Sequence, residues 1–295
     1  MNFKQFLYED DLPPHVKKGW AVDNDASRKH ALEWILLNAK YALEHNNLIF
    51  RGFSTPPSQD ISFIDASQGE RKSKDTNNVY QIMMDNSMFM KDYPSRSKSL
   101  ICTNDFDTAD EFGTRYVIFP RRQQIIAVAD KSDLLFKRVE GNAKTSFGSR
   151  TVKDFSHKIG ILFSQYLSLG IEDMTSASLN HAMSEMSPNG FDNFLQALLV
   201  HDIEAGIKQI EKYISVGMSR FDAICSFFMS PESLGLETYK YNVDSISSYS
   251  ERELWFSGRA LVISLAAMKE LLPDIEYSGV NISHNIQILF NGMRL

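Results

Sequence analysis

Two glutamates separated by one residue stand directly before an apolar run, in the stretch Ser250-Glu251-Arg252-Glu253-Leu254-Trp255-Phe256. If residues 252–256 form a strand, side-chain alternation sends Glu251 and Glu253 to the same face, where the chain enters the strand. One such carboxylate can stabilise a developing positive charge while the other orients or deprotonates a nucleophile. Most Glu-x-Glu pairs are solvated surface residues, so the pair indicates a site only in the company of other functional groups.

Other candidate functional groups lie far upstream in the sequence, in two segments. Residues 47–53 predict an apolar strand that carries one arginine, Arg51, and the chain continues with Gly52. The run at 95–119 is rich in serine and threonine and leads into Ala-x-x-Phe-Gly at 109–113, followed by a strand-like apolar stretch. Arginine's planar guanidinium suits a pyrophosphate better than lysine does. These residue types fit a site for a phosphate-bearing ligand whose reaction develops positive charge.

Taken in this order, the chain resembles the Arg-Ser-Glu class of mono-ADP-ribosyltransferases. The matching parts are the arginine strand, the Ser/Thr strand with its Ala-x-x-Phe-Gly helix, and the Glu-x-Glu before a strand, over roughly residues 47–128 and 245–265. The resemblance implies an α+β fold, with an ADP-ribosyltransferase-like split β-sheet core and a large helical insertion. It also implies NAD⁺ as substrate, no metal, and a protein acceptor.

The resemblance assigns roles residue by residue. Glu253 would be the catalytic carboxylate that stabilises the ribosyl oxocarbenium. Glu251 would orient or activate the acceptor, an arrangement that in the family often accompanies transfer to arginine. Arg51 would bind the phosphate and ribose side of NAD⁺. The cofactor-binding set that the resemblance implies is Arg51, Gly52, Tyr80, Ser97, Ser99 and Thr103, with Tyr80 stacking on nicotinamide.

The serine-threonine-serine element of the family departs from its usual form in this chain. Its place falls on Cys102-Thr103-Asn104, so Thr103 supplies a hydroxyl but the flanking serines are missing. A strand through Ser97, Ser99 and Thr103 would put all three on one face, which makes Ser99 and Thr103 both candidates. Structural roles compete at each position, because Arg51 could pair with an acid at a strand edge and Tyr80 could be a half-buried strand residue.

Two other functions are consistent with the same pattern. One is NAD⁺ hydrolysis, with water as the acceptor. The other is a non-enzymatic virion or interaction protein built on a degraded transferase scaffold. The discriminating feature is geometric, since an enzyme requires Arg51, Glu253 and the Ser/Thr strand to converge on one open cleft.

Composition excludes several function classes. The 295 residues, 43% hydrophobic and 23% charged, are typical of a soluble globular protein, and a net charge of -6 argues against general nucleic-acid binding. Two cysteines make neither a disulfide framework nor a zinc cluster. The sequence shows no signal peptide and no apolar run long enough to span a bilayer. We therefore expect the protein to work in a reducing, cytoplasmic compartment. The opening residues resemble those of tailed-phage proteins. For a phage protein the location would be the host cytoplasm or the virion, and the natural acceptor would be a host protein.

The chain divides by pattern into an arm at 1–26, a core at 27–133 and 245–295, and a helical insertion at 134–244. In the core, the patterns predict a helix at 27–44, a long loop at 54–77 and a short helix at 107–113. Core strands are predicted at 48–53, 78–84, 98–103, 115–119, 123–129, 252–256, 259–264 and 286–290. Insertion helices are predicted at 152–169, 176–186, 191–200, 203–214 and 219–229.

Overall fold

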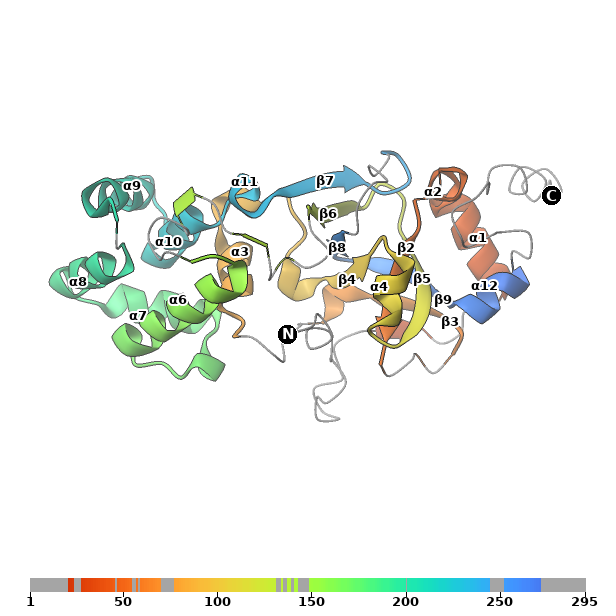
Figure 1. The fold of residues 1–295 in the computed structure, drawn as a ribbon, viewed down its shortest axis with the longest axis horizontal. Coiled ribbons are helices and arrows are strands. Elements are labelled where there is room, and N and C mark those ends of the chain that lie inside the picture. Colours follow the sequence, from red (N-terminus) through yellow and green to blue (C-terminus); the bar gives the residue numbers. More distant parts are fainter. Residues whose placement is uncertain are drawn as a thin grey trace. The chain divides into compact units, whose positions relative to one another are not determined.

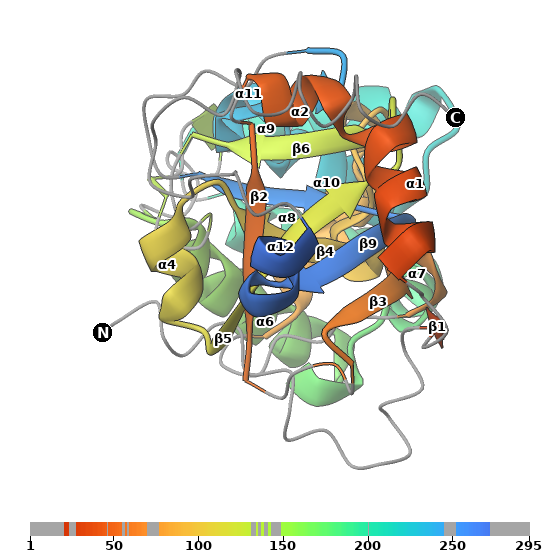
Figure 2. The same ribbon diagram turned by 90° about the vertical axis from the view of Figure 1, so that its right-hand side faces the viewer.

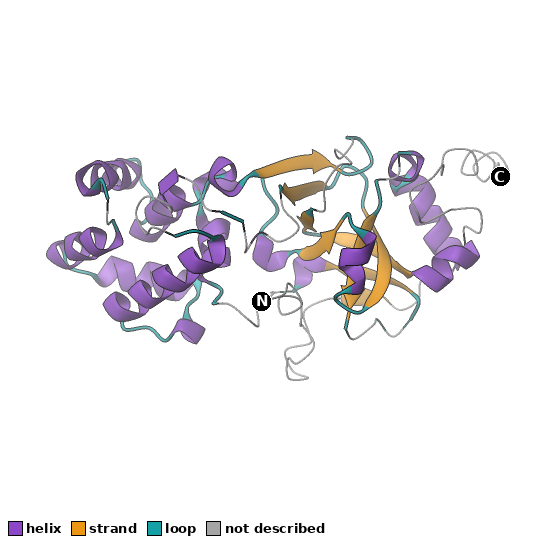
Figure 3. Cartoon of the chain, viewed as in Figure 1, coloured by secondary structure: helices purple, strands orange, loops and turns teal. Residues whose placement is uncertain are grey.

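The computed structural model describes residues 21–23, 28–45, 47–54, 57, 59–69, 77–130, 134, 137–138, 141–142, 149–199, 201–244 and 252–271. The chain forms two compact units (Figures 1 and 3). The sheet unit comprises Met1–Arg71, Pro94–Ser132 and Glu237–Leu295, and the helical unit comprises Lys72–Tyr93 and Asp133–Leu236. Helix and antiparallel sheet are thus both present, as the α+β prediction requires.

The sheet contains nine strands among the described residues, in the order β1-β3-β9-β5-β2-β4-β8-β6-β7. Each of the seven strand pairs whose register is established is antiparallel, and Figure 1 labels the strands. The strands are β1 (Ala21–Asp23), β2 (Ile49–Phe53), β3 (Ile61–Asp65), β4 (Leu100–Thr103), β5 (Thr114–Pro120), β6 (Ile125–Ala129), β7 (Leu236–Lys240), β8 (Glu253–Phe256) and β9 (Arg259–Ser264). Because neighbours in the sheet come from distant parts of the chain, residues near 50, 100 and 255 meet on adjacent strands.

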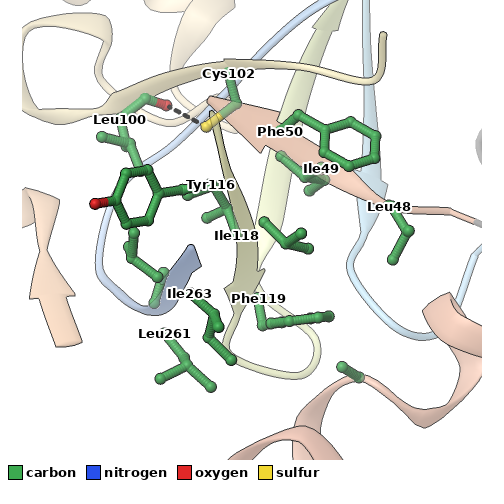
Figure 4. Packing of buried hydrophobic residues seen from close by; sticks show 14 of the residues in the cluster. Leu48, Ile49, Phe50, Leu100, Cys102, Tyr116, Ile118, Phe119, Leu261 and Ile263 are labelled. Carbon is green, nitrogen blue, oxygen red and sulfur yellow. Dashed lines mark hydrogen bonds between the residues drawn. The ribbon is translucent and has the colours of Figure 1, made fainter. Parts of the chain in front are cut away.

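Short helices cover this sheet. They are α1 (Arg28–Asn38), α2 (Lys40–Glu44), α4 (Phe106–Asp110) and α12 (Leu265–Leu271), with the 3-10 turns η3 (Ala66–Gln68) and η5 (Arg96–Lys98). Helices α1 and α12 both contact β5 (Figure 2), and the Trp34 indole donates to the Phe119 carbonyl at 2.9 Å. Figure 4 shows part of the core, where Ile49 of β2 lies across from Ile118 of β5. Apolar burial of these strands is the main force that brings them together.

The helical unit has an aromatic core of its own. Its elements are α3 (Val79–Asn86), η4 (Met88–Met90), α6 (Val152–Leu167), η7 (Ile171–Asp173), α7 (Ser176–Glu185), α8 (Pro188–Leu198), α9 (Ile203–Ser215), α10 (Arg220–Phe228) and α11 (Pro231–Leu234). Phe163 packs against Phe194 and Phe221 with ring centroids 5.9 and 6.1 Å apart. Thr151, Ser187 and Ser219 cap three of the helices with their hydroxyls, which satisfies backbone N–H groups at the helix starts.

Five sequence predictions for the core need correction. Residues 78–84 form helix α3 instead of a strand, because buried Val79, Tyr80, Met83 and Met84 recur at helical spacing. The predicted loop at 54–77 contains β3, which pairs with β9. The helix predicted at 27–44 is two helices that meet at Ala39, and the strand predicted at 98–103 starts only at Leu100. Residues 72–93 also belong to the helical unit, whereas the sequence assigned them to the core. The strand predicted at 286–290 lies outside the described residues.

Two tyrosines at the end of the sheet bury hydroxyl groups. Among the described residues, neither the Tyr239 nor the Tyr241 hydroxyl has a hydrogen-bond partner, and burial raises the pKa of both phenols well above the ordinary value. An unsatisfied buried hydroxyl carries a desolvation cost of about 1–3 kcal/mol. Each phenol therefore stays protonated in the folded protein at a pH where the unfolded chain has lost that proton.

We expect Tyr241→Phe to raise the free energy of unfolding by about 1 kcal/mol at pH 7, because it removes that unsatisfied group. In the wild type, the contribution of the raised phenol pKa values is fully present below the unfolded value of about 10 and is lost as pH rises above it. The variant should therefore lose less stability between neutral and alkaline pH. Urea unfolding from pH 7 to 11 measures both effects, and a less stable variant at pH 7 would contradict the packing described here.

Candidate functional site

Three neighbouring strands of the sheet unit carry the arginine, the threonine and the glutamate that the sequence singled out. Thr103 at the end of β4 lies directly across from Glu253 at the start of β8. On the other side of β4, Thr103 lies across from Phe50 of β2, whose next residue is Arg51. Residues across from each other in an antiparallel pair point to the same face. Thr103 and Glu253 are therefore immediate neighbours on one face, together with Phe50. Arg51, the next residue on β2, points to the opposite face, so the structure does not bring its side chain together with those of Thr103 and Glu253.

The Glu253 carboxylate is closed off by an arginine that the sequence analysis did not assign to the site. Glu253 is 1% exposed, and its Oε1 forms an ion pair with Nη1 of Arg96, which is equally buried. The Arg96 guanidinium also lies over the Trp255 ring, 4.8 Å from its centroid. Glu253 and Trp255 are two residues apart on β8, so they share a face. The Arg96 side chain thus contacts both Glu253 and Trp255 on that face.

A short turn holds Arg96 in this position. The Trp255 indole donates to the Pro94 carbonyl at 3.0 Å, just before η5 begins. The Ser99 hydroxyl donates to the Ser95 carbonyl at 2.6 Å, and the Ser95 and Ser97 hydroxyls are 3.1 Å apart. Ser97 therefore lies on a 3-10 turn and not on a strand, which corrects the prediction of one face through Ser97, Ser99 and Thr103. Both predicted serines stabilise the turn that carries Arg96.

The side chains of Arg51 and Thr103 are also buried and engaged. Arg51 is 3% exposed, its Nη1 donates to the Ile101 carbonyl, and its guanidinium lies 5.0 Å from the Phe53 ring centroid. The Thr103 hydroxyl accepts from the Asp105 backbone N–H at 3.0 Å, at the point where β4 turns into α4. The Thr103 hydroxyl can still donate to a ligand, since one O–H both accepts and donates.

The remaining residues of the predicted site lie elsewhere. Tyr80 belongs to α3 of the helical unit and is fully buried there, so its ring has no face open for stacking on nicotinamide. Glu251 lies outside the described residues. Gly52 lies in the middle of β2, and a Cβ placed there would overlap the Ala109 carbonyl oxygen and come 2.8 Å from Phe112 Cβ. Gly52 thus allows α4 to pack directly on the strand.

The same contact explains the Ala-x-x-Phe-Gly pattern. Ala109 of α4 and Phe112, just after its end, rest on Gly52. Gly113 has a φ of 124°, and a Cβ added to it would overlap the Phe53 carbonyl. A positive φ of this size is strained for any residue with a side chain. These residues hold the β2–α4 contact and thereby fix where Arg51 and Thr103 lie.

A metal site, a membrane-spanning helix and a surface pocket are other features of the described residues that could indicate a function. The described residues contain no group of three or more His, Cys, Asp or Glu side chains that could hold a metal ion, and none of the described helices is both long and apolar enough to cross a membrane. A surface pocket of about 370 Å³ includes none of Arg51, Thr103 and Glu253; it is lined by Leu36, Leu37, Lys40, Tyr41, Glu44, Arg122, Asn242 and Val243. No protein-family model, curated protein or solved structure matches the chain.

Proposed function

We propose that the sheet unit is an ADP-ribosyltransferase-like core that transfers ADP-ribose from NAD⁺ to a protein side chain. The observation that supports this proposal is that a hydroxyl and a carboxylate from distant segments lie side by side on β4 and β8, while Arg51 lies on the neighbouring strand β2 with its side chain on the other face. Thr103 directly across from Glu253 is the central element of that arrangement. In the proposal, the helical unit is an insertion in this core.

The proposed reaction begins with cleavage of the bond between the ribose C1′ and the nicotinamide nitrogen. The bonding electrons leave with nicotinamide, which departs neutral, and positive charge develops on the ribose. Glu253 would stabilise that charge and accept a hydrogen bond from the 2′-hydroxyl. Arg51 would bind the pyrophosphate, and Glu251 would take the proton that the acceptor loses as it attacks C1′.

The burial of Glu253 favours a second candidate. A carboxylate that is 1% exposed and already paired with Arg96 is what a scaffold without activity would retain. In that case the chain is a non-enzymatic virion or interaction protein on a degraded transferase scaffold. A third variant, NAD⁺ hydrolysis, uses the same site with water as the acceptor.

The deciding experiment uses NAD⁺ labelled in its adenylate half, incubated with the protein in the presence and absence of cell lysate. We expect label on protein, and a loss of at least about 100-fold in Glu253→Gln, because the variant cannot offset the developing charge. Glu237→Gln is the matched control, since Glu237 is an exposed carboxylate of the same unit. Thermal unfolding of both variants allows turnover to be expressed per folded protein.

Each of the other results selects a different candidate. Free ADP-ribose without labelled protein means hydrolysis. No product, together with no NAD⁺ binding by calorimetry, contradicts transferase and hydrolase alike and leaves the scaffold. Equal labelling by wild type and Glu253→Gln would show that Glu253 does not carry the chemistry.

A further inference from the structure

We infer that Arg96 is an autoinhibitory latch on Glu253, so that the arrangement described above is a closed state of the site. This inference rests on the proposed function. It adds a residue that neither the Arg-Ser-Glu pattern nor its spacing assigns to the site, and it specifies how that site is regulated.

The charges provide the first argument. The reaction needs Glu253 as the counter-charge for a cation that forms on the ribose, and a guanidinium is a cation of the same sign already bound to that carboxylate. The two cations compete for one carboxylate. A buried charge pair is screened little by water or salt, so Arg96 remains an effective competitor until its side chain leaves.

Burial provides the second argument. Glu253 is 1% exposed and the Arg96 side chain is 0% exposed, so a ribose cannot reach the carboxylate while the pair is intact. Trp255 closes the same face, with the Arg96 guanidinium over its ring. Access to Glu253 therefore requires a movement of Arg96 away from β8.

The turn at 94–99 is a suitable element for that movement. It is joined to β8 by the indole hydrogen bond from Trp255 to Pro94 and by the side chain of Arg96 itself. Hydrogen bonds between Ser95, Ser97 and Ser99 lie within the turn, which also contacts η3. Lys98 is exposed. A movement of the turn away from β8 can keep these internal hydrogen bonds while it breaks the two contacts with β8.

An opening step of this kind lowers the apparent affinity for NAD⁺, because only the open fraction of the protein binds. Arg96→Met keeps the apolar stem that packs on Trp255 and removes the competing cation. We expect this variant to bind NAD⁺ about tenfold more tightly and to show a higher kcat/KM per folded protein. Arg115→Met is the matched control, because Arg115 also pairs with a carboxylate, Asp110 at 3.2 Å, and lies 4.0 Å from a ring centroid, Phe106, in the same unit.

If Arg96 instead positions Glu253 for catalysis, the substitution should lower activity and not raise it. If Arg96 holds Glu253 in its working orientation, Arg96→Met lowers kcat and leaves the affinity for NAD⁺ unchanged, and this result overturns the latch. If the wild type is active and Arg96→Met has the same NAD⁺ affinity and kcat/KM, the latch is overturned as well. Absence of NAD⁺ binding and turnover in both proteins is the failure of the proposed function itself, whereas an inactive wild type with an active Arg96→Met supports the function and the latch together.

A measurement on the wild type avoids any effect of the substitution on folding. NAD⁺ should increase backbone hydrogen exchange at residues 94–99 and change the fluorescence of Trp255, because both lose a partner when the turn lifts. The fluorescence of Trp34 and Trp20 is separated from that of Trp255 by comparing Trp255→Phe. Slower exchange of 94–99 upon NAD⁺ binding would mean that the ligand tightens the turn, and it would overturn the latch.

Discussion

Gly52→Ala is expected to disrupt the sheet unit, with a loss of about 3 kcal/mol or more in the free energy of unfolding. The added methyl group overlaps the carbonyl oxygen of Ala109 and lies 2.8 Å from Phe112 Cβ. Both neighbours belong to α4 and to the turn that ends it, and the Ala109 oxygen is backbone, so no side-chain rotation relieves the overlap. Either α4 lifts from β2 or the strand bends, and both changes open the apolar core beneath.

Urea unfolding followed by circular dichroism measures this loss. Gly190→Ala is the control, because Gly190 lies inside helix α8 and its added Cβ would meet only the Ser187 hydroxyl, at 3.1 Å. Alanine is favoured over glycine in a helix by about 1 kcal/mol, so the control should be as stable as the wild type or more so. A Gly52→Ala protein of wild-type stability would show that α4 does not rest on β2 at this distance.

The same contact shows why part of the site could be predicted from sequence. The order of arginine strand, Ala-x-x-Phe-Gly and Glu-x-Glu predicted that Arg51, Thr103 and Glu253 would converge. Their strands are neighbours and Thr103 lies across from Glu253, but Arg51 follows Phe50 and so points to the other face of the sheet. The glycines and alanine of that pattern are residues whose small size a close β2–α4 packing demands. Local patterns of this kind survive in a sequence because the backbone permits few alternatives there.

Apolar residues at helical spacing over long segments also predicted the helices correctly. The five helices predicted in the region 152–229 all exist, with ends that differ by a few residues. Short apolar runs were not decisive. Residues 79–84 are apolar at both helical and alternating spacing, and tertiary packing against α6, α7 and α10 selects the helix. Strand β3 was missed because its five residues follow a run rich in proline and polar residues, and its pairing with β9 is made across nearly two hundred positions.

The closure of Glu253 could not be predicted, because it depends on one contact between distant residues. Arg96 stands among serines that looked like a Ser/Thr strand, and nothing in its local sequence indicates a carboxylate 157 positions away as its partner. The only local signal is the arginine itself, in a segment that immediately precedes a buried strand. A charged residue at such a position is either solvated or paired, and the partner is determined by the fold.

The second large effect is expected from breaking that pair. Arg96→Met should lower the free energy of unfolding by about 3–5 kcal/mol, because it leaves a buried carboxylate without its counter-charge. Glu253→Gln should be costly for the corresponding reason, since it leaves the guanidinium of Arg96 buried beside a neutral amide. The double variant, Arg96→Met with Glu253→Gln, removes both charges, and we expect it to be more stable than the sum of the single effects implies.

Urea unfolding of the wild type, the two single variants and the double variant gives the coupling free energy between Arg96 and Glu253. The same set of variants at the surface pair of Arg115 and Asp110 gives the coupling free energy of an exposed ion pair for comparison. Arg115 is 28% exposed and Asp110 62%, so that cycle should return about 0–1 kcal/mol and fall with added salt. A coupling between Arg96 and Glu253 as small and as salt-dependent would mean that water reaches the carboxylate in solution. Glu253 would then be open without any movement of the turn, and the latch would lose its basis while Thr103 and Glu253 remained paired across β4 and β8.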